Sequence, residues 1–221
     1  MDLFGKAVSD YFNKTIKIPL YFTYKDISPK RTKKNIKRYF RKYWQLDKLE
    51  KKLISMVKGN TLDIGCATGY YIPYMQKRAE VIGVDISDYL IDICHKKGLE
   101  NCIKQDVFTY EPTLKFDTIT LLESNIGLGG SSESLDKLLH KIKDLLNPDG
   151  QVLCIQHNYE AEYIDCEITA EYCSERETFT WSYMNLYFLK SQCEDAGFDF
   201  DVISHGVNKT YLVRLTLQQH I

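Results

Sequence analysis

The fold is decided by one stretch, Leu62-Asp63-Ile64-Gly65-Cys66-Ala67-Thr68-Gly69. Its first residues predict a short buried strand, and its glycines allow the backbone to turn sharply and approach a ligand closely. A helix is expected from about Tyr70 to Arg78, and its N-terminus would point at the same crevice. The stretch therefore predicts a strand, a glycine turn and a helix arranged around a ligand.

Short apolar strands alternate with helices on both sides of this stretch. Such an alternation predicts an α/β fold, a parallel sheet with helices on both faces and right-handed crossovers. Near the end of the chain, two strands follow each other without a helix, so a hairpin adds an antiparallel strand. The expected strands are 61–64, 80–84, 102–105, 116–122, 151–156, 178–184, 198–204 and 210–217, and the later helices are 87–98, 131–146 and 185–196.

Acidic residues stand at the ends of three successive strands. Asp85 ends the second strand, 20 residues after Gly65, where a carboxylate can accept hydrogen bonds from both hydroxyls of a ribose. Asp106 ends the third strand and could bind the exocyclic amine of an adenine. Asp63 could hold loop N–H groups or, through water, the ammonium of an amino-acid tail. Ligands in open α/β sheets bind beyond the carboxyl ends of the strands, so these acids converge on one crevice.

Two other interpretations of the glycine turn fit the sequence less well. A dinucleotide-binding fold requires G-x-G-x-x-G, whereas Gly65-x-Ala67-x-Gly69 is followed here by Tyr70 and Tyr71, which would crowd a pyrophosphate. A turn needed only for folding would leave the three acids unexplained. A nucleoside-binding site therefore accounts best for the pattern.

Five segments together resemble the class I S-adenosylmethionine (SAM) dependent methyltransferases. The glycine stretch resembles their motif I, usually written L-D-x-G-C-G-T-G. Val84-Asp85-Ile86-Ser87 resembles the acidic end of their second strand, and Gln105-Asp106-Val107 resembles their adenine-contacting segment. Phe116-Asp117-Thr118-Ile119 resembles their FD-x-I signature, and the segment from Leu146 to Leu153 resembles their L-x-P-G-G-x-L turn.

The resemblance is close from about Gly59 to Cys154 and implies a seven-stranded sheet with an antiparallel last strand. Ala67 replaces a commoner glycine, and we expect it to need only an ordinary backbone conformation; Asp149 replaces a glycine in a turn that tolerates Asp. The implied cofactor is SAM, with S-adenosylhomocysteine (SAH) as its product. The residues expected to hold it are Asp63, Gly65, Cys66, Ala67, Gly69, Asp85, Ile86, Asp106, Val107 and Glu123.

Three residues are candidates for catalysis. Glu123 follows the fourth strand, beside the methionine end of the cofactor in this family, and could be a general base or an orienting, salt-bridged group. Asn125 begins the run Asn125-Ile126-Gly127-Leu128-Gly129-Gly130, similar to a subset of bacterial methyltransferases, and could bind the cofactor carboxylate, the acceptor or only turn backbone. His157 follows the fifth strand as a catalyst or a solvated loop residue.

We expect a helical N-terminal cap or lid at 1–58 and a SAM-binding domain at 59–221, with an acidic insert at about 158–178. Apolar residues from Thr32 to Val57 recur at helical spacing, among thirteen Lys and Arg between Lys25 and Lys58. This basic helix is either a solvated face or a surface for an anionic partner. Aromatic residues in 1–29 either close over the site or pack the first helix onto the sheet.

Composition excludes several classes of protein. The chain has 221 residues, a formal net charge of -1 and no run of 18 apolar residues, so neither a membrane protein nor a globally basic nucleic-acid binder is expected. Its start lacks the pattern of a secretory signal, and we expect a cytoplasmic monomer or homodimer. The cysteines form no CxxC pair and no Cys/His cluster at zinc spacing, so no metal is expected. They are Cys66, Cys94, Cys102, Cys154, Cys166, Cys173 and Cys193.

The function predicted from the sequence is transfer of a methyl group from SAM to an amine, hydroxyl or thiol of a small molecule. A nucleic-acid partner is not expected, since the chain is near neutral and has no appended RNA-binding module. One alternative is an RNA methyltransferase that uses the basic helix at Lys30–Lys58. Another is a SAM-binding protein whose chemistry is not methylation.

Overall fold

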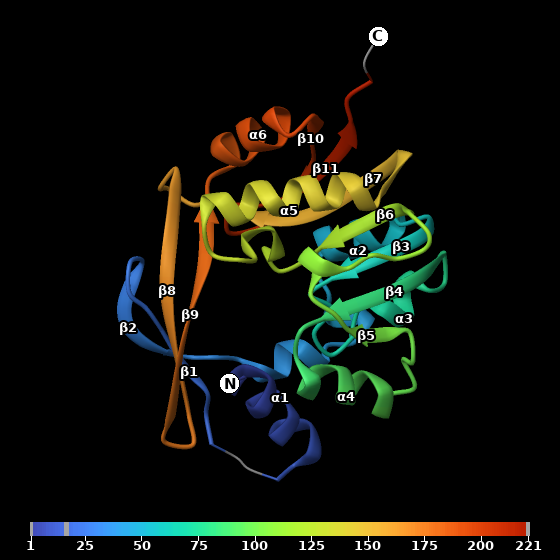
Figure 1. Cartoon of the computed structure of the whole chain (residues 1–221). Helices are drawn as coiled ribbons and strands as arrows, with labels where there is room; N and C mark the ends of the chain where they lie inside the picture. Colours follow the sequence, from blue (N-terminus) through green and yellow to red (C-terminus); the bar gives the residue numbers. More distant parts are fainter. Residues whose placement is uncertain (1, 16–17, 220–221) are drawn as a thin grey trace.

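A seven-stranded sheet forms the centre of the protein, whose computed structural model describes residues 2–15 and 18–219 (Figure 1). The strand order is β10-β11-β7-β6-β3-β4-β5, and only β11 runs antiparallel to its neighbours. The predicted α/β fold with an antiparallel last strand is confirmed. The strands are β3 (Gly59–Ile64), β4 (Ala79–Asp85), β5 (Cys102–Lys104), β6 (Phe116–Leu121), β7 (Leu146–His157), β10 (Phe198–His205) and β11 (Thr210–Leu217).

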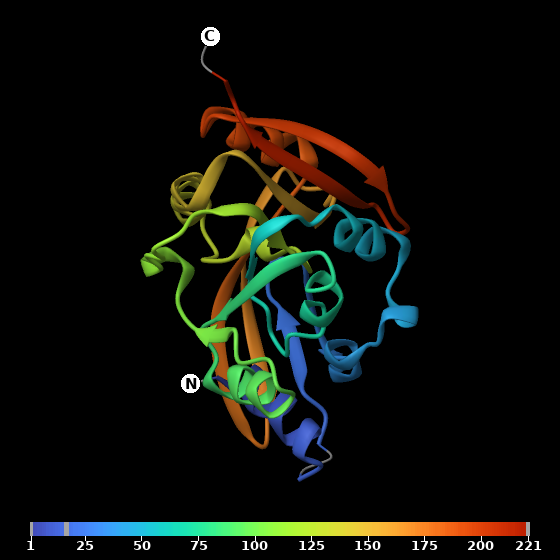
Figure 2. The same cartoon turned by 90° about the vertical axis from the view of Figure 1, so that its right-hand side faces the viewer.

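Helices cover both faces of this sheet (Figure 2). On one face lie α5 (Ser132–Leu145) and α6 (Leu186–Asp195), and on the other lie α2 (Lys48–Met56), α3 (Ile72–Met75) and α4 (Asp88–Lys96). Helix α5 shows why the sequence folds this way, since its apolar residues recur every three or four positions and all face the sheet. They are Leu135, Leu138, Leu139, Ile142 and Leu145, each buried.

A second, four-stranded antiparallel sheet stands opposite the carboxyl ends of the parallel strands (Figure 1). Its order is β2-β1-β8-β9, so strands from the N-terminal segment pair with the hairpin formed by the acidic insert. Helix α1 (Leu3–Asn13) packs between this sheet and α4. The strands are β1 (Tyr21–Tyr24), β2 (Ser28–Lys33), β8 (Tyr163–Tyr172) and β9 (Glu175–Met184).

The predicted helix from Thr32 to Val57 is wrong. The chain forms β2, then two short 3-10 turns, η1 (Ile36–Phe40) and η2 (Tyr43–Gln45), and only α2 is α-helical. Helix α2 starts late because Asp47 caps it, accepting a hydrogen bond from the Glu50 N–H while Glu50 accepts one from the Asp47 N–H. The first 58 residues are therefore only partly helical, and their role as a cap stays a prediction.

In the described part of the chain, no helix has the length and apolar character needed to span a membrane.

Candidate functional site

The glycine turn after β3 has three residues in the left-handed conformation. The φ angles are 72° at Gly65, 50° at Ala67 and 64° at Gly69. The expectation that Ala67 would be ordinary is wrong, since a non-glycine residue in this region costs about 1 kcal/mol. Hydrogen bonds on both sides hold Ala67 in place: its N–H donates to Asp85 Oδ2 (2.9 Å), and its carbonyl accepts from Cys94 Sγ (3.3 Å).

Asp85 closes the turn from the end of β4. Besides the Ala67 contact, its Oδ1 accepts the N–H of Ser87 at 3.0 Å, so backbone donors fix the carboxylate beside the glycine turn. Burial raises the pKa of Asp85, while these hydrogen bonds act in the opposite direction. The carboxylate is thus preorganised at the strand end where the sequence predicts a ribose.

Asp63 lies beneath the turn with half of its carboxylate unpaired. Its side chain is buried, and Oδ1 accepts a 2.7 Å hydrogen bond from Thr120, while Oδ2 has no partner among the described residues. Burial raises the pKa of Asp63 to about 7. A buried polar atom without a partner is costly, so this oxygen marks where a water or a ligand group would bind. The arrangement fits a cofactor that carries an ammonium group.

Replacing Asp63 with asparagine is expected to stabilise the free protein at high pH. The carboxyl's folded pKa is about 7, above its ordinary value of 3.8, so the contribution of this group to the stability of the wild type is fully present below pH 4 and is lost as the pH rises through 7. Asparagine mimics the protonated form and removes this slope. Urea unfolding at pH 4 and pH 8 should show no difference at pH 4 and a gain of about 1 to 4 kcal/mol at pH 8. Parallel stability curves for the two proteins would contradict the assignment.

The third acid, Asp106, follows β5 and is exposed. Its Oδ1 accepts the N–H of Phe108 (3.0 Å) and so caps the short turn η3 (Val107–Thr109). Ile86, directly after Asp85, is 69% exposed and offers an apolar surface to a flat ring. The three acids thus lie at one edge of the sheet, as predicted. A separate hollow of 650 Å³, lined in part by Asn60, lies at the opposite, amino-terminal edge.

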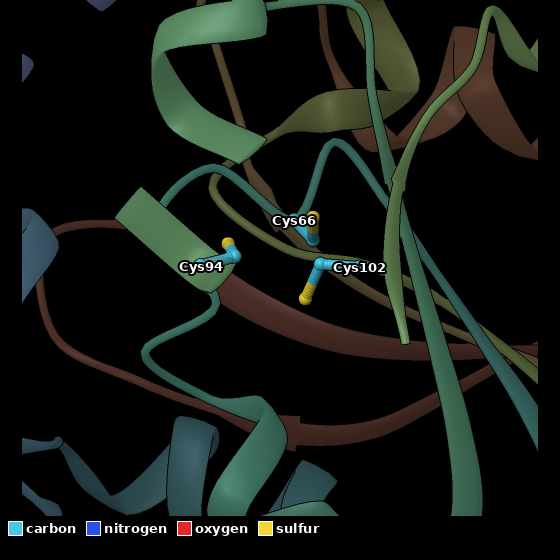
Figure 3. A group of neighbouring side chains, drawn as sticks. All are labelled: Cys66, Cys94 and Cys102. Carbon is cyan, nitrogen blue, oxygen red and sulfur yellow. The ribbon is translucent and has the colours of Figure 1, made fainter. Parts of the chain in front are cut away.

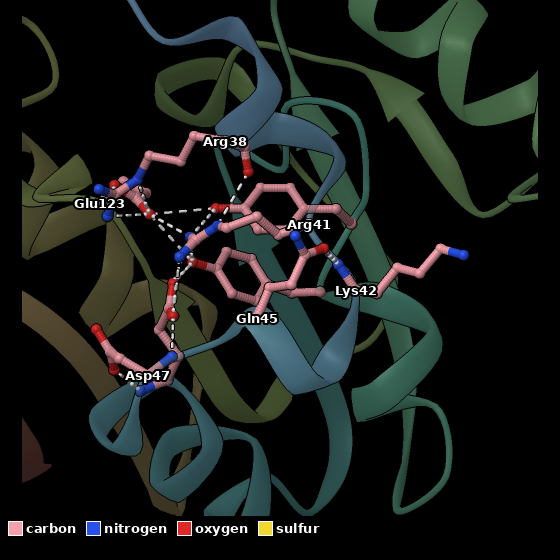
Figure 4. A network of polar contacts seen from close by, with 9 residues as sticks. Arg38, Arg41, Lys42, Gln45, Asp47 and Glu123 are labelled. Atoms are coloured by element: carbon pink, nitrogen blue, oxygen red, sulfur yellow. Dashed lines mark hydrogen bonds and ion pairs between the residues drawn. The ribbon is translucent and has the colours of Figure 1, made fainter.

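Glu123 follows β6 and is surrounded by donors (Figure 4). Its carboxylate accepts hydrogen bonds from Arg38 Nε and Nη2 (3.0 and 2.8 Å) and from Arg41 Nη2 (3.1 Å). The hydroxyls of Tyr70 and Tyr71 donate to the same oxygen at 3.2 and 3.1 Å. The sequence left two roles open for Glu123, a general base or an orienting, salt-bridged group. In this structure Glu123 is salt-bridged.

The same network continues inward to Glu50 on α2. Arg41 binds Glu50 through two nitrogens (2.5 and 3.1 Å), and the single proton of the Tyr71 hydroxyl is shared between Glu50 and Glu123. Glu50 is 3% exposed and Arg41 16%, so this ion pair is largely buried. Burial raises the pKa of both Tyr70 and Tyr71, which therefore keep their protons. Sequence reasoning missed this network because it placed the arginines on a solvated helix face.

Asn125 and His157 are held by different contacts. The Asn125 amide donates to the carbonyls of Ile64 (2.8 Å) and Gly65 (3.1 Å), so it ties the segment after β6 to the glycine turn. A side chain on Gly65 would collide with this amide. His157 ends β7 with its ring edge against Tyr159, 4.6 Å between centroids, and burial lowers its pKa, with a smaller effect from Lys209. His157 is therefore neutral at pH 7.

Four tyrosines gather on the side of the site that the second sheet provides. Tyr183 on β9 lies 4.9 Å from Tyr159 and 6.4 Å from Tyr24 on β1, measured between ring centroids. Burial raises the pKa of Tyr159 to about 12 and that of Tyr39 and Tyr183 also, and in all three the Tyr24 hydroxyl adds to the rise. We call Tyr24, Tyr39, Tyr159 and Tyr183 the tyrosine cluster. Tyr39, Tyr159 and Tyr183, whose pKa values are raised, are therefore protonated at neutral pH.

The tyrosine cluster lies close to the cofactor edge. Tyr39 packs edge-on against Tyr70 of the Glu123 network, 6.5 Å between centroids, and Glu123 also raises the Tyr39 pKa. The Tyr39 carbonyl accepts a hydrogen bond from Thr68 in the glycine turn. The tyrosine cluster is thus joined through Tyr39 to both the Glu123 network and the glycine turn.

Comparison with known proteins agrees with this geometry. The family model of a methyltransferase domain matches residues 29–203. A SAM-dependent methyltransferase from Bacteroides fragilis, solved with SAH, is 25% identical over 99% of this chain and 95% of its own, with a TM-score of 0.87. No curated protein gives a significant match.

Two further solved structures share the fold at 13% identity. They are the sugar N-methyltransferase KedS8 from Streptoalloteichus sp ATCC 53650 (84% of this chain, 94% of its own, TM-score 0.62) and the amino pentose methyltransferase CalS10 from Micromonospora echinaspora (82%, 94% and 0.60). The match over 29–203, the strand order and the close structural likeness to a SAH complex lead to one identification. The chain belongs to the methyltransferase domain family and is a class I SAM-dependent methyltransferase.

Proposed function

We propose that this enzyme methylates an amine nitrogen of a small polar molecule, held between the tyrosine cluster and Glu123. The observation that carries the proposal is the second sheet, which stands opposite the strand ends where the cofactor acids lie; its strands β1 and β9 carry Tyr24 and Tyr183. Rigid aromatic walls with polar tips suit a small acceptor that has both apolar and hydrogen-bonding surface.

The cofactor would be held by the residues that the sequence predicts. Asp85 is fixed for the ribose, Asp63 offers its unpaired oxygen toward the amino-acid tail, and Ile86 offers a surface for the adenine. The Arg38 guanidinium is 49% exposed and suits the carboxylate of the same tail. The remaining proposed contacts are Gly65, Cys66, Ala67, Gly69, Asp106, Val107 and Glu123.

The state of the ionisable groups favours an amine over a hydroxyl acceptor. SAM supplies a methyl group on a sulfonium, and alignment of the two reactants can provide about 7 to 11 kcal/mol of the barrier. A hydroxyl acceptor would gain from a strong base, but Glu123 is paired with two arginines and the tyrosines keep their protons. A neutral amine needs no base to attack and loses its proton after the methyl group has arrived.

Two of the three proposed catalytic residues then have positioning tasks. Glu123 orients Arg38 and the tyrosine hydroxyls, and Asn125 holds the glycine turn. His157 is neutral at pH 7 and borders Tyr159, so it can relay to solvent the proton that the methylated amine releases. The names of KedS8 and CalS10 give sugar acceptors, and one of them names nitrogen, which supports an amino sugar or a similar polyfunctional amine as the first compounds to test.

An acceptor screen tests the proposal directly. The protein would be incubated with SAM and matched pools of amines, their hydroxyl analogues and RNA, with SAH and the methylated product measured by mass spectrometry. We expect SAH and a singly methylated product in the amine pool. A methylated product in the hydroxyl pool alone would contradict the proposal of an amine acceptor. RNA methylation together with salt-sensitive RNA retention would favour the alternative function, an RNA methyltransferase.

The change Tyr183→Phe is expected to lower kcat/KM for the amine about tenfold, since one hydrogen bond to the acceptor is lost. Binding of SAH should stay within about twofold of the wild type. Tyr187→Phe is the matched control, because Tyr187 is 77% exposed on α6, away from the cluster. Equal kcat/KM values for the two variants would contradict the proposal that Tyr183 binds the acceptor. Cytoplasmic location and a monomeric or homodimeric state stay predictions.

A further inference from the structure

Three buried cysteines meet directly behind the glycine turn (Figure 3). Cys66 belongs to the turn itself, Cys94 to α4 and Cys102 to β5, and their sulfur atoms all lie within 4.8 Å of one another. Each side chain is at most 2% exposed. Sequence spacing gave no sign of this group, because its members come from three separate elements that only the fold brings together.

A positive charge lies beside the three sulfur atoms. Lys97 follows helix α4, and its charge would stabilise the thiolates that form when a metal displaces the thiol protons. The ammonium of Lys97 is anchored nearby through a 2.6 Å hydrogen bond to the Thr68 carbonyl. A thiolate, not a thiol, is the form of cysteine that ligates metals.

We propose that Cys66, Cys94 and Cys102 together bind one Cu(I) ion through their three sulfur atoms. A metal–thiolate bond of about 2.3 Å places three sulfurs about 4 Å apart around a shared ion, which agrees with the limit of 4.8 Å. Thiolates select soft ions such as Cu(I) and zinc.

The number of ligands distinguishes between these two ions. A structural zinc site takes four protein ligands in a tetrahedron. Among residues 2–15 and 18–219, no fourth His, Cys, Asp or Glu joins the three sulfurs. A buried three-sulfur set suits Cu(I), which is stable with three sulfur ligands, and Lys97 offsets part of the remaining negative charge.

The ion would lie on the opposite side of the turn from the cofactor. Ala67 shows this arrangement, because its N–H points to Asp85 and its carbonyl to Cys94. Ligation of Cys66 would join the turn to α4 and β5 through the ion. The site is separate from the acceptor residues, so its test does not depend on the proposed substrate.

The test is an anaerobic titration of the reduced protein with Cu(I) supplied as its coloured bicinchoninate complex. We expect the protein to withdraw one equivalent of Cu(I), and the thermal midpoint of unfolding to rise as it does so. Cys94→Ala should weaken binding at least about 100-fold, because removal of even an outer partner of a metal site costs 10 to 100-fold. X-ray absorption of the loaded protein should show three sulfur ligands.

Cys193→Ala is the matched control, since Cys193 is also a fully buried cysteine on a helix but lies outside the group. It should bind Cu(I) as the wild type does. Should Cys94→Ala not unfold cooperatively, Cys102→Ala replaces it with the same expectation. Failure of the wild type to compete with bicinchoninate, equal loss in Cys193→Ala, or displacement of Cu(I) by equimolar zinc would each overturn the proposal.

Discussion

Replacing Asp85 with alanine is expected to weaken the binding of SAM and SAH at least about 100-fold. In the proposed complex the carboxylate accepts hydrogen bonds from both ribose hydroxyls, and each bond to a charged acceptor contributes about 1.5 to 3 kcal/mol. The change also removes the acceptor of the Ala67 N–H, which helps to hold a non-glycine residue in the left-handed conformation. Isothermal titration with SAH measures the loss.

Asp88→Ala serves as the control for this experiment. Asp88 lies three residues further on, with its side chain 76% exposed and paired with Lys104 on the surface. Its replacement should leave the SAH affinity unchanged. Both variants should unfold cooperatively, and a near-normal affinity in Asp85→Ala would refute the ribose role.

Replacing Arg41 with methionine is expected to lower the free energy of unfolding by about 3 kcal/mol. Removal of one partner of a buried ion pair leaves an uncompensated charge, which costs about 3 to 5 kcal/mol. Here the carboxylate of Glu50 would lose two charged hydrogen bonds at a position that is 3% exposed, and Glu123 would lose one. Urea unfolding at pH 7 measures the difference.

Lys37→Met controls for the loss of a positive charge from the same basic run, because Lys37 is exposed. It should change the stability by less than about 0.5 kcal/mol. The double variant Arg41→Met with Glu50→Gln should recover part of the loss, since the buried charge is then absent. Equal effects of Arg41→Met and Lys37→Met would mean that the network does not stabilise the fold.

The central sheet could be predicted because its signals are local. Each strand is short and apolar, each helix has a regular apolar face, and Ser87 and Ser131 mark helix starts where the structure places them. The three acids follow from the same logic, because strand ends meet at one edge of a parallel sheet. The prediction of an ordinary backbone conformation at Ala67 was wrong because Asp85, which holds the Ala67 N–H, is distant in sequence.

The second sheet was only partly visible in the sequence. Strand β8 was missed although its buried residues alternate with polar ones, since its acidic composition suggested a solvated insert. The buried residues of this strand are Cys166, Ile168, Ala170 and Tyr172. The tyrosine cluster, the Glu123 network and the three cysteines could not be found, since each joins residues from several elements and no spacing rule reports such contacts.

The second sheet also has a consequence for folding and for engineering. Its two halves come from opposite parts of the chain, as shown by the ion pair between Arg31 and Glu171, which are 140 positions apart. Closing so long a segment carries an entropic cost that local contacts do not, so this wall of the proposed acceptor site is expected to assemble late, after the ribosome has released most of the polypeptide. Grafting the insert hairpin alone onto another enzyme would transplant half a binding wall, and any exchange of specificity must therefore move β1 and β2 together with β8 and β9.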